Sequence, residues 1–141
     1  EKFRSNYLDV DNDALYPFGY GLSYTTFRFS DITLNRSSIG MDNELVASVT
    51  VTNTGDRAGS EVVQLYIRDL VGSVTRPVKE LKGFEKIYLQ PNESRTVRFT
   101  IAPEMLKFYN ADLKFVAEPG DFDVMIGPDS RNVKTARFTL R

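Results

Sequence analysis

The sequence predicts an all-β protein built as an antiparallel β-sandwich. Three observations support this fold class. About seven or more short segments alternate apolar and polar residues, clusters of Gly, Pro, Asn and Asp separate them at the spacing of sandwich strands, and no segment shows the period of a long helix. A chain of 141 residues is long enough for one such domain with a buried core.

The first 26 residues are expected to form an extended aromatic linker, and residues 27–141 to form the sandwich. The stretch from Leu15 to Phe27, LYPFGYGLSYTTF, places five aromatic residues within thirteen positions. Gly19 and Gly21 let the backbone turn tightly or approach another surface closely. Because a buried aromatic ring contributes on the order of 2–3 kcal/mol, we expect this stretch to lie across a neighbouring surface.

The first half of residues 27–141 predicts three strands. The first has a shift of parity near residues 30–31 that indicates a β-bulge. A polar loop over residues 35–43 separates it from a half-buried strand, and a turn containing Gly55 and Gly59 leads to the third. The expected inward residues are Phe27, Phe29, Ile32, Leu34, Leu45, Ala47, Val49, Val51, Val63, Leu65 and Ile67.

In the second half, the pattern predicts five more strands after a loop over Leu70–Val78. Residues 81–89 are extended, residues 96–101 alternate, and Pro103 suits the first position of a helical turn. Short strands follow at 113–116, 122–126 and 135–140, with turns at 110–112, 119–121 and 127–129. The expected core residues are Phe84, Ile87, Val97, Phe99, Ile101, Phe122, Val124, Ile126, Ala136, Phe138 and Leu140.

Composition excludes several classes of function. The formal net charge of −1 gives no reason to expect a nucleic-acid partner, and no apolar run reaches membrane-spanning length. The chain has no His and no Cys, which excludes Ser/His/Asp and Cys/His catalysis and disfavours zinc. We therefore expect no cofactor, no metal and no membrane partner. The polar start, EKFRSNYLDV, predicts the middle of a longer polypeptide.

Four motifs carry a family resemblance that covers nearly the whole chain. They are LYPFGYGLSYTTF (15–27), VTVTNTGDRAGSEVVQLYIRD (49–69), RPVKELKGFEKIYLQPNES (76–94) and PGDFDVMIG (119–127). Together they resemble the C-terminal fibronectin type III-like domain of glycoside hydrolase family 3 enzymes, chiefly β-glucosidases and β-xylosidases. Ala14 stands where the family often has proline. Phe122 lacks the hydroxyl of the tyrosine that often ties a corner of such sandwiches, so it can pack but cannot make that hydrogen bond.

The resemblance implies an enzyme that hydrolyses terminal β-D-glucosyl or related residues by a retaining mechanism. Such enzymes carry an aspartate nucleophile in a (β/α)8 domain and often an acid/base in an α/β sandwich domain. The motifs of those domains match no position here, so no catalytic residue is assigned and this chain alone is expected to be inactive. The implied partners are those two domains, with glycan substrate at the rim, and the implied location is periplasmic or secreted.

Residues for contact with the missing domains are chosen by surface chemistry, because aromatic rings and arginine are favoured at interfaces. The candidates are Tyr7, Tyr16, Phe18, Tyr20 and Arg76, together with the loop Leu70–Val78. The expected role is to pack on the catalytic domains and stabilise their placement.

Two other roles remain open from the residues themselves. A carbohydrate-binding module would stack sugars on exposed rings such as Tyr66 or Tyr88, and a free-standing adhesion or scaffold domain of a surface protein needs only the sandwich. Asp121 with Asp123, and Glu80 with Glu85, provide carboxylate pairs, although hydrolysis needs a set separation and exposed carboxylates are usual on a sandwich.

Overall fold

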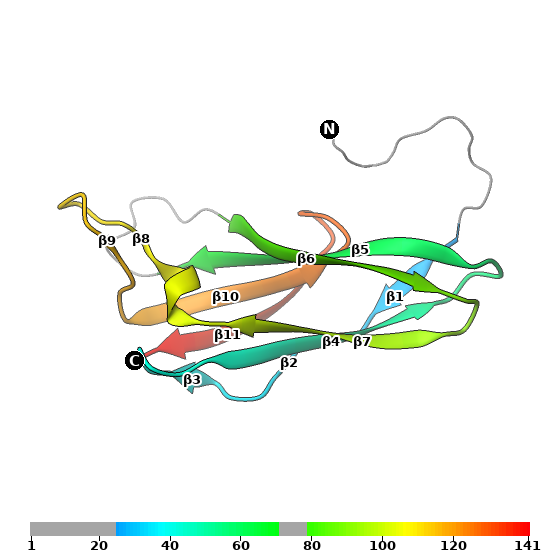
Figure 1. Ribbon diagram of the computed structural model, residues 1–141, viewed down its shortest axis with the longest axis horizontal. Coiled ribbons are helices and arrows are strands. Elements are labelled where there is room, and N and C mark those ends of the chain that lie inside the picture. Colours follow the sequence, from blue (N-terminus) through cyan, green and yellow to red (C-terminus); the bar gives the residue numbers. More distant parts are fainter. Residues whose placement is uncertain (1–24, 71–78) are drawn as a thin grey trace.

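The computed structural model describes residues 25–70 and 79–141, whose two main β-sheets pack face to face (Figure 1). Residues 1–24 of the proposed linker and residues 71–78 of the following loop lie outside the described residues. The elements of the described residues, in chain order, are β1 (Phe27–Phe29), β2 (Thr33–Leu34), β3 (Ser38–Ile39), β4 (Leu45–Asn53), β5 (Gly59–Asp69), β6 (Lys79–Leu89), β7 (Ser94–Ile101), the 3-10 helix η2 (Pro103–Leu106), β8 (Phe108–Tyr109), β9 (Phe115–Val116), β10 (Gly120–Gly127) and β11 (Lys134–Leu140).

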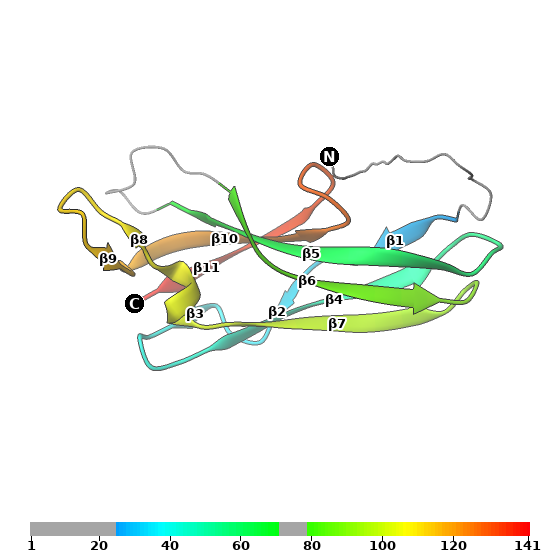
Figure 2. The ribbon, with the colours of Figure 1, turned by 45° about the horizontal axis from the view of Figure 1, so that its top comes forward.

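The two sheets have different sizes and share one core. In the smaller sheet β4 pairs with β7 on one side and with β1 and β2 on the other, and the larger has the order β3-β11-β10-β5-β6. The main pairings are antiparallel, whereas β3 runs parallel to β11. Figure 2 shows β4 and β7 in one layer and β5 and β10 in the other. The predicted all-β sandwich is confirmed.

The predicted bulge between β1 and β2 is present. Phe29 pairs with Val51 and Thr33 pairs with Ser48, so four steps along one strand match three along β4. Ser30 fills the irregularity: its N–H donates to the Thr50 carbonyl at 2.9 Å, and its Oγ accepts the Thr50 N–H at 2.8 Å. The extra residue explains why the apolar positions change parity here.

The core lies between the sheets and contains most of the predicted inward residues. Phe122 and Phe138 are both buried and stack with their ring centroids 5.5 Å apart. Phe122 therefore packs as expected without a hydroxyl. The fully or nearly fully buried core residues include Leu45, Ala47, Val49, Val51, Val63, Leu65, Ile67, Ile87, Leu89, Val97, Ile101, Val124, Ile126 and Leu140.

The prediction that Phe84 lies in the core is wrong, since its side chain is 68% exposed. Ile87 and Phe84 are three residues apart, and a regular strand places such residues on opposite faces. β6 has one irregularity in its pairing with β5: Gly83 pairs with Leu65 and Leu81 pairs with Tyr66, so the residue between Leu81 and Gly83 has no partner in β5. Because this irregularity precedes Gly83, it does not change the faces of Phe84 and Ile87 relative to each other.

The polar loop predicted for residues 35–43 contains a short strand. Ile39 in β3 is completely buried and pairs with Leu140 of β11. A two-residue strand gives no alternation to detect, which explains the omission. Gly59, expected in the preceding turn, is the first residue of β5.

Asn53 at the end of β4 is a buried polar centre that joins three segments. Its Nδ2 donates to the carbonyls of Arg57 at 2.8 Å and Leu89 at 3.0 Å. Its Oδ1 accepts the Gly55 N–H at 3.0 Å and the Thr25 hydroxyl at 2.9 Å. Asn53 thus connects the start of the described chain, the β4–β5 turn and the end of β6.

Candidate interdomain surface

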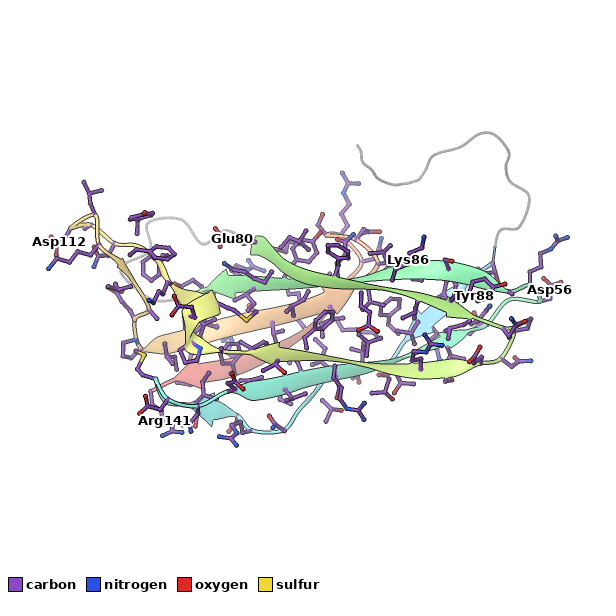
Figure 3. The ribbon with its side chains drawn as sticks, viewed as in Figure 1. Asp56, Glu80, Lys86, Tyr88, Asp112 and Arg141 are labelled. Atoms are coloured by element: carbon purple, nitrogen blue, oxygen red, sulfur yellow. The ribbon has the colours of Figure 1, made fainter. Side chains whose placement is uncertain are left out.

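Three large apolar side chains lie on the outer face of β6, a terminal strand of the larger sheet. Leu81 is 53% exposed, Phe84 68% and Tyr88 54%. Their pairing partners on β5 are Tyr66, Gln64 and Ser60, which alternate with the inward residues, so the three share one face. We call Leu81, Phe84 and Tyr88 the apolar stripe; Figure 3 shows Tyr88 and the neighbouring Lys86 on β6.

Tyr66 next to the stripe is only half-buried, but its ring is occupied. The Lys79 ammonium lies 5.8 Å from the ring centroid, and the Tyr66 hydroxyl donates a hydrogen bond to Gln64. Burial, with a smaller contribution from the negative charge of Asp129, raises the pKa of Tyr66. Lys79 also donates to the Ser130 carbonyl. This arrangement leaves Tyr66 poorly placed to stack on a sugar, whereas Tyr88 is open.

A second apolar group is carried by the β8–β9 hairpin, which projects at one end of the sandwich (Figure 1). Tyr109 is 70% exposed, Leu113 81% and Phe115 52%. The rings of Tyr109 and Phe115 are 5.0 Å apart between centroids. The hairpin forms its own two-stranded sheet, so its exposed side chains are separate from the main core.

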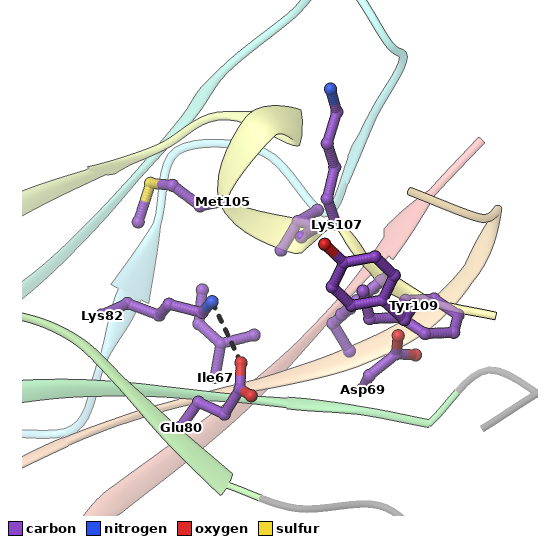
Figure 4. Close-up of a pocket in the computed structure, with 10 residues that line it drawn as sticks. Ile67, Asp69, Glu80, Lys82, Met105, Lys107 and Tyr109 are labelled. Carbon is purple, nitrogen blue, oxygen red and sulfur yellow. Dashed lines mark ion pairs between the residues drawn. The ribbon is translucent and has the colours of Figure 1, made fainter. Parts of the chain in front are cut away.

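A groove of about 220 Å³ lies between β6 and the segment that leads into the hairpin (Figure 4). On its wall Lys82 Nζ forms an ion pair with Glu80 Oε1 at 3.0 Å. Residues from both elements line it, among them Tyr109 of the hairpin but none of the three stripe residues. The lining residues are Ile67, Asp69, Glu80, Lys82, Met105, Leu106, Lys107, Phe108, Tyr109 and Phe122.

Asp121 and Asp123 share one face of β10, as expected, but they are engaged with β11. Asp121 Oδ1 accepts the Thr139 hydroxyl at 2.9 Å, and Asp123 Oδ1 accepts Arg137 Nε at 3.1 Å. Asp123 is only 7% exposed, which corrects the expectation of two exposed carboxylates. This hydrogen bond raises the pKa of Arg137. Both carboxylates thus hold the sheet together.

The predicted contact residues Tyr7, Tyr16, Phe18, Tyr20 and Arg76 lie outside the described residues. The stripe and the hairpin were missed as contact surfaces. The alternation of inward and outward residues, counted from Ile87, places Phe84 on the outer face, whereas exposure of the hairpin depends on tertiary structure.

In the described parts of the chain, no three or more His, Cys, Asp or Glu side chains lie close enough together to hold a metal ion. Within the same ranges, no helix has the length and apolar character needed to cross a membrane.

Glu61 on β5 predicts a measurable dependence of stability on pH. Burial raises its pKa from 4.5 to about 7, opposed by a hydrogen bond from the Val62 N–H and aided by the charge of Asp129. The folded state therefore favours the protonated carboxyl. Its stabilising effect is complete below about pH 4.5 and is lost as the pH rises through about 7.

We expect the free energy of unfolding to fall by about 1–3 kcal/mol between pH 4.5 and pH 8, because one pKa unit equals about 1.4 kcal/mol and the side chain keeps some contact with water. In Glu61→Gln this decrease in the free energy of unfolding should disappear. In the control Glu85→Gln, which changes an exposed carboxylate of β6, the decrease should persist. Urea denaturation at three pH values measures both. An equal pH slope in the wild type and in Glu61→Gln would contradict the assignment.

Comparison with known proteins gives consistent matches. A family model described as fibronectin type III-like domain matches residues 61–130. A periplasmic beta-glucosidase of Salmonella typhimurium is 55% identical over 139 residues, covering 99% of this chain and 18% of that protein. A putative beta-xylosidase of Formosa agariphila is 50% identical with the same coverage. The chain thus spans under a fifth of the length of these relatives.

Solved structures agree with the sequence matches. A β-glucosidase from Erythrobacter marinus superposes with a TM-score of 0.78 at 49% identity, covering 99% of this chain and 18% of that one. A β-glucosidase from Listeria innocua superposes with a TM-score of 0.76 at 41% identity, covering 99% and 19%. The sandwich described above is thus similar to a segment of much longer polypeptides.

Proposed function

Because this chain belongs to the fibronectin type III-like domains of family 3 glycoside hydrolases, we propose that it is a non-catalytic C-terminal accessory domain of a β-glucosidase-like enzyme. Its role is to pack on the catalytic domains of the same polypeptide and to stabilise them. The observation that carries this proposal is the apolar stripe of Leu81, Phe84 and Tyr88. These side chains are exposed on a sandwich that corresponds to only 18% of the length of the Salmonella relative.

The physical basis is burial of the stripe on docking. A large apolar side chain contributes about 1.5–3 kcal/mol when it passes from water to a packed interface. Interfaces between domains of one chain bury on the order of 600–1,500 Å², with aromatic residues at their centres. The exposed charge of Lys86, which lies between Phe84 and Tyr88 on the same face of β6, suits the polar rim of such a contact.

The catalytic chemistry belongs to other domains in this proposal. Retaining hydrolysis needs two carboxyl groups about 5–5.5 Å apart, one as nucleophile and one as acid/base. The two β10 carboxylates of this chain are engaged with β11 and serve the sheet. The parent enzyme would remove terminal β-D-glucosyl or related residues, and the names of the relatives support a β-glucoside or β-xyloside substrate.

The lead-in of residues 1–26 complements the stripe in this proposal. Its rings Tyr16, Phe18 and Tyr20, with Tyr7 and Arg76, would extend the contact with the (β/α)8 and α/β sandwich domains. The proposed location is periplasmic or secreted, which the periplasmic beta-glucosidase of Salmonella typhimurium supports.

The test compares the full-length polypeptide that contains this chain with the 141-residue chain by itself. We expect the full-length protein to hydrolyse an aryl β-glucoside and the chain alone to give no turnover above buffer. Calorimetric titration of the chain with β-glucan should give no saturable heat. Turnover by the chain, or saturable heat that is lost in Tyr88→Ala, would favour an enzyme or a carbohydrate-binding module instead.

A further inference from the structure

Leu113 at the tip of the β8–β9 hairpin combines two unfavourable features. Its φ is 61°, in the left-handed region where glycine and asparagine are preferred and branched side chains are rare. Its side chain is also 81% exposed, so the domain itself gains little from having leucine there. Strain and exposure at one residue suggest a role outside the isolated domain.

The turn around Leu113 is held by local hydrogen bonds. Asn110 Oδ1 accepts the N–H groups of Asp112 at 2.9 Å and Lys114 at 3.1 Å. The Leu113 N–H donates to the Asn110 carbonyl at 2.9 Å, and the Asn110 N–H to the Lys114 carbonyl at 3.0 Å. These bonds keep Leu113 in its left-handed conformation. Asparagine or glycine at position 113 would fit the same turn with less strain.

Leu113 extends an apolar group that begins with two aromatic rings. Tyr109 and Phe115 lie 5.0 Å apart, are 70% and 52% exposed, and sit at the base of the hairpin. We call Tyr109, Leu113 and Phe115 the apolar knob. Tyr109 also lines the groove between β6 and the segment that leads into the hairpin.

We propose that the apolar knob inserts into an apolar hollow on the remainder of the parent polypeptide, with Leu113 as the residue kept for this contact at the expense of the domain's own stability. The inference rests on the proposed function. The occupant is another part of the same polypeptide because the matching segment accounts for only 18% of the Salmonella and Formosa relatives.

The test uses the opposite signs expected in two contexts. In the 141-residue chain, Leu113→Asn and Leu113→Gly should raise the midpoint of thermal unfolding by about 2–4 °C, because the left-handed strain is relieved. In the full-length protein the same variants should make amide exchange over residues 108–116 at least about tenfold faster, because the anchor of the knob is removed. The control Met41→Asn removes a 47% exposed apolar side chain from the β3–β4 turn and should change neither measurement.

Two results would overturn the inference. One is unchanged exchange over residues 108–116 in the full-length Leu113 variants. If the double substitution Leu81→Asp and Phe84→Asp in the apolar stripe disrupts docking of the full-length protein while exchange in the Leu113 variants is unchanged, the proposed function stands and only the knob is excluded. The other is concentration-dependent sedimentation of the 141-residue chain that Leu113→Asn abolishes, since the knob would then bind a second copy.

Discussion

Replacing Asn53 with leucine is expected to lower the free energy of unfolding of the 141-residue chain by about 3–5 kcal/mol. The side chain is completely buried and makes four hydrogen bonds, two as donor and two as acceptor. Leucine has the same branching and the same number of side-chain heavy atoms but leaves those partners unsatisfied, and each buried unsatisfied group costs about 1–3 kcal/mol. The partners belong to three segments, so the loss should loosen one end of the sandwich.

Chemical denaturation followed by far-UV circular dichroism measures this change, because the chain has no tryptophan. Thr54→Ala is the matched control one residue away, since its hydroxyl makes an exposed contact with Thr26 at 2.9 Å. We expect the control to change stability by less than about 0.5 kcal/mol. A loss below about 1 kcal/mol for Asn53→Leu would show that the buried network contributes little.

The second large effect is expected when Leu81 and Phe84 are both changed to aspartate. Both side chains are more than half exposed, so the stability of the 141-residue chain should change by less than about 1 kcal/mol. In the full-length protein, docking should weaken by about 4 kcal/mol or more, because two apolar contacts are lost and two charges would be buried. The domain should then become sensitive to limited proteolysis at the junction.

The matched control adds the same charge elsewhere. Thr96→Asp with Thr100→Asp places two carboxylates on the exposed face of β7, in the other sheet. This pair should leave the full-length protein as resistant to proteolysis as the wild type. If the double aspartate variants of β6 and of β7 become equally sensitive to proteolysis, the added charge explains the effect and the stripe is not an interface.

The sheets could be predicted from sequence because apolar alternation reports directly which face of a strand is buried. Leu45 to Val51 illustrate this, since every second residue of that segment enters the core. The method failed where alternation was broken or too short to read. The core prediction for Phe84 is wrong although Ile87, three residues later, is buried and therefore indicates that Phe84 faces outward. The burial of Ile39 is not predicted because its strand has only two residues.

The candidate surface was harder to predict, because exposure of an apolar residue is a property of the packed fold. The sequence pointed to aromatic residues in the lead-in, which lie outside the described residues. The stripe required the register of β6 against β5, and the strain at Leu113 required its backbone angle. Neither quantity can be read from residue types alone.

The most direct measurement of docking is amide hydrogen exchange over residues 79–89 in the full-length protein and in the isolated 141-residue chain. β6 is a terminal strand with three exposed apolar side chains, so covering it should restrict opening. We predict exchange at least about tenfold slower in the full-length protein over this segment, with β4 little changed. Equal rates over residues 79–89 in the two proteins would contradict docking through this face.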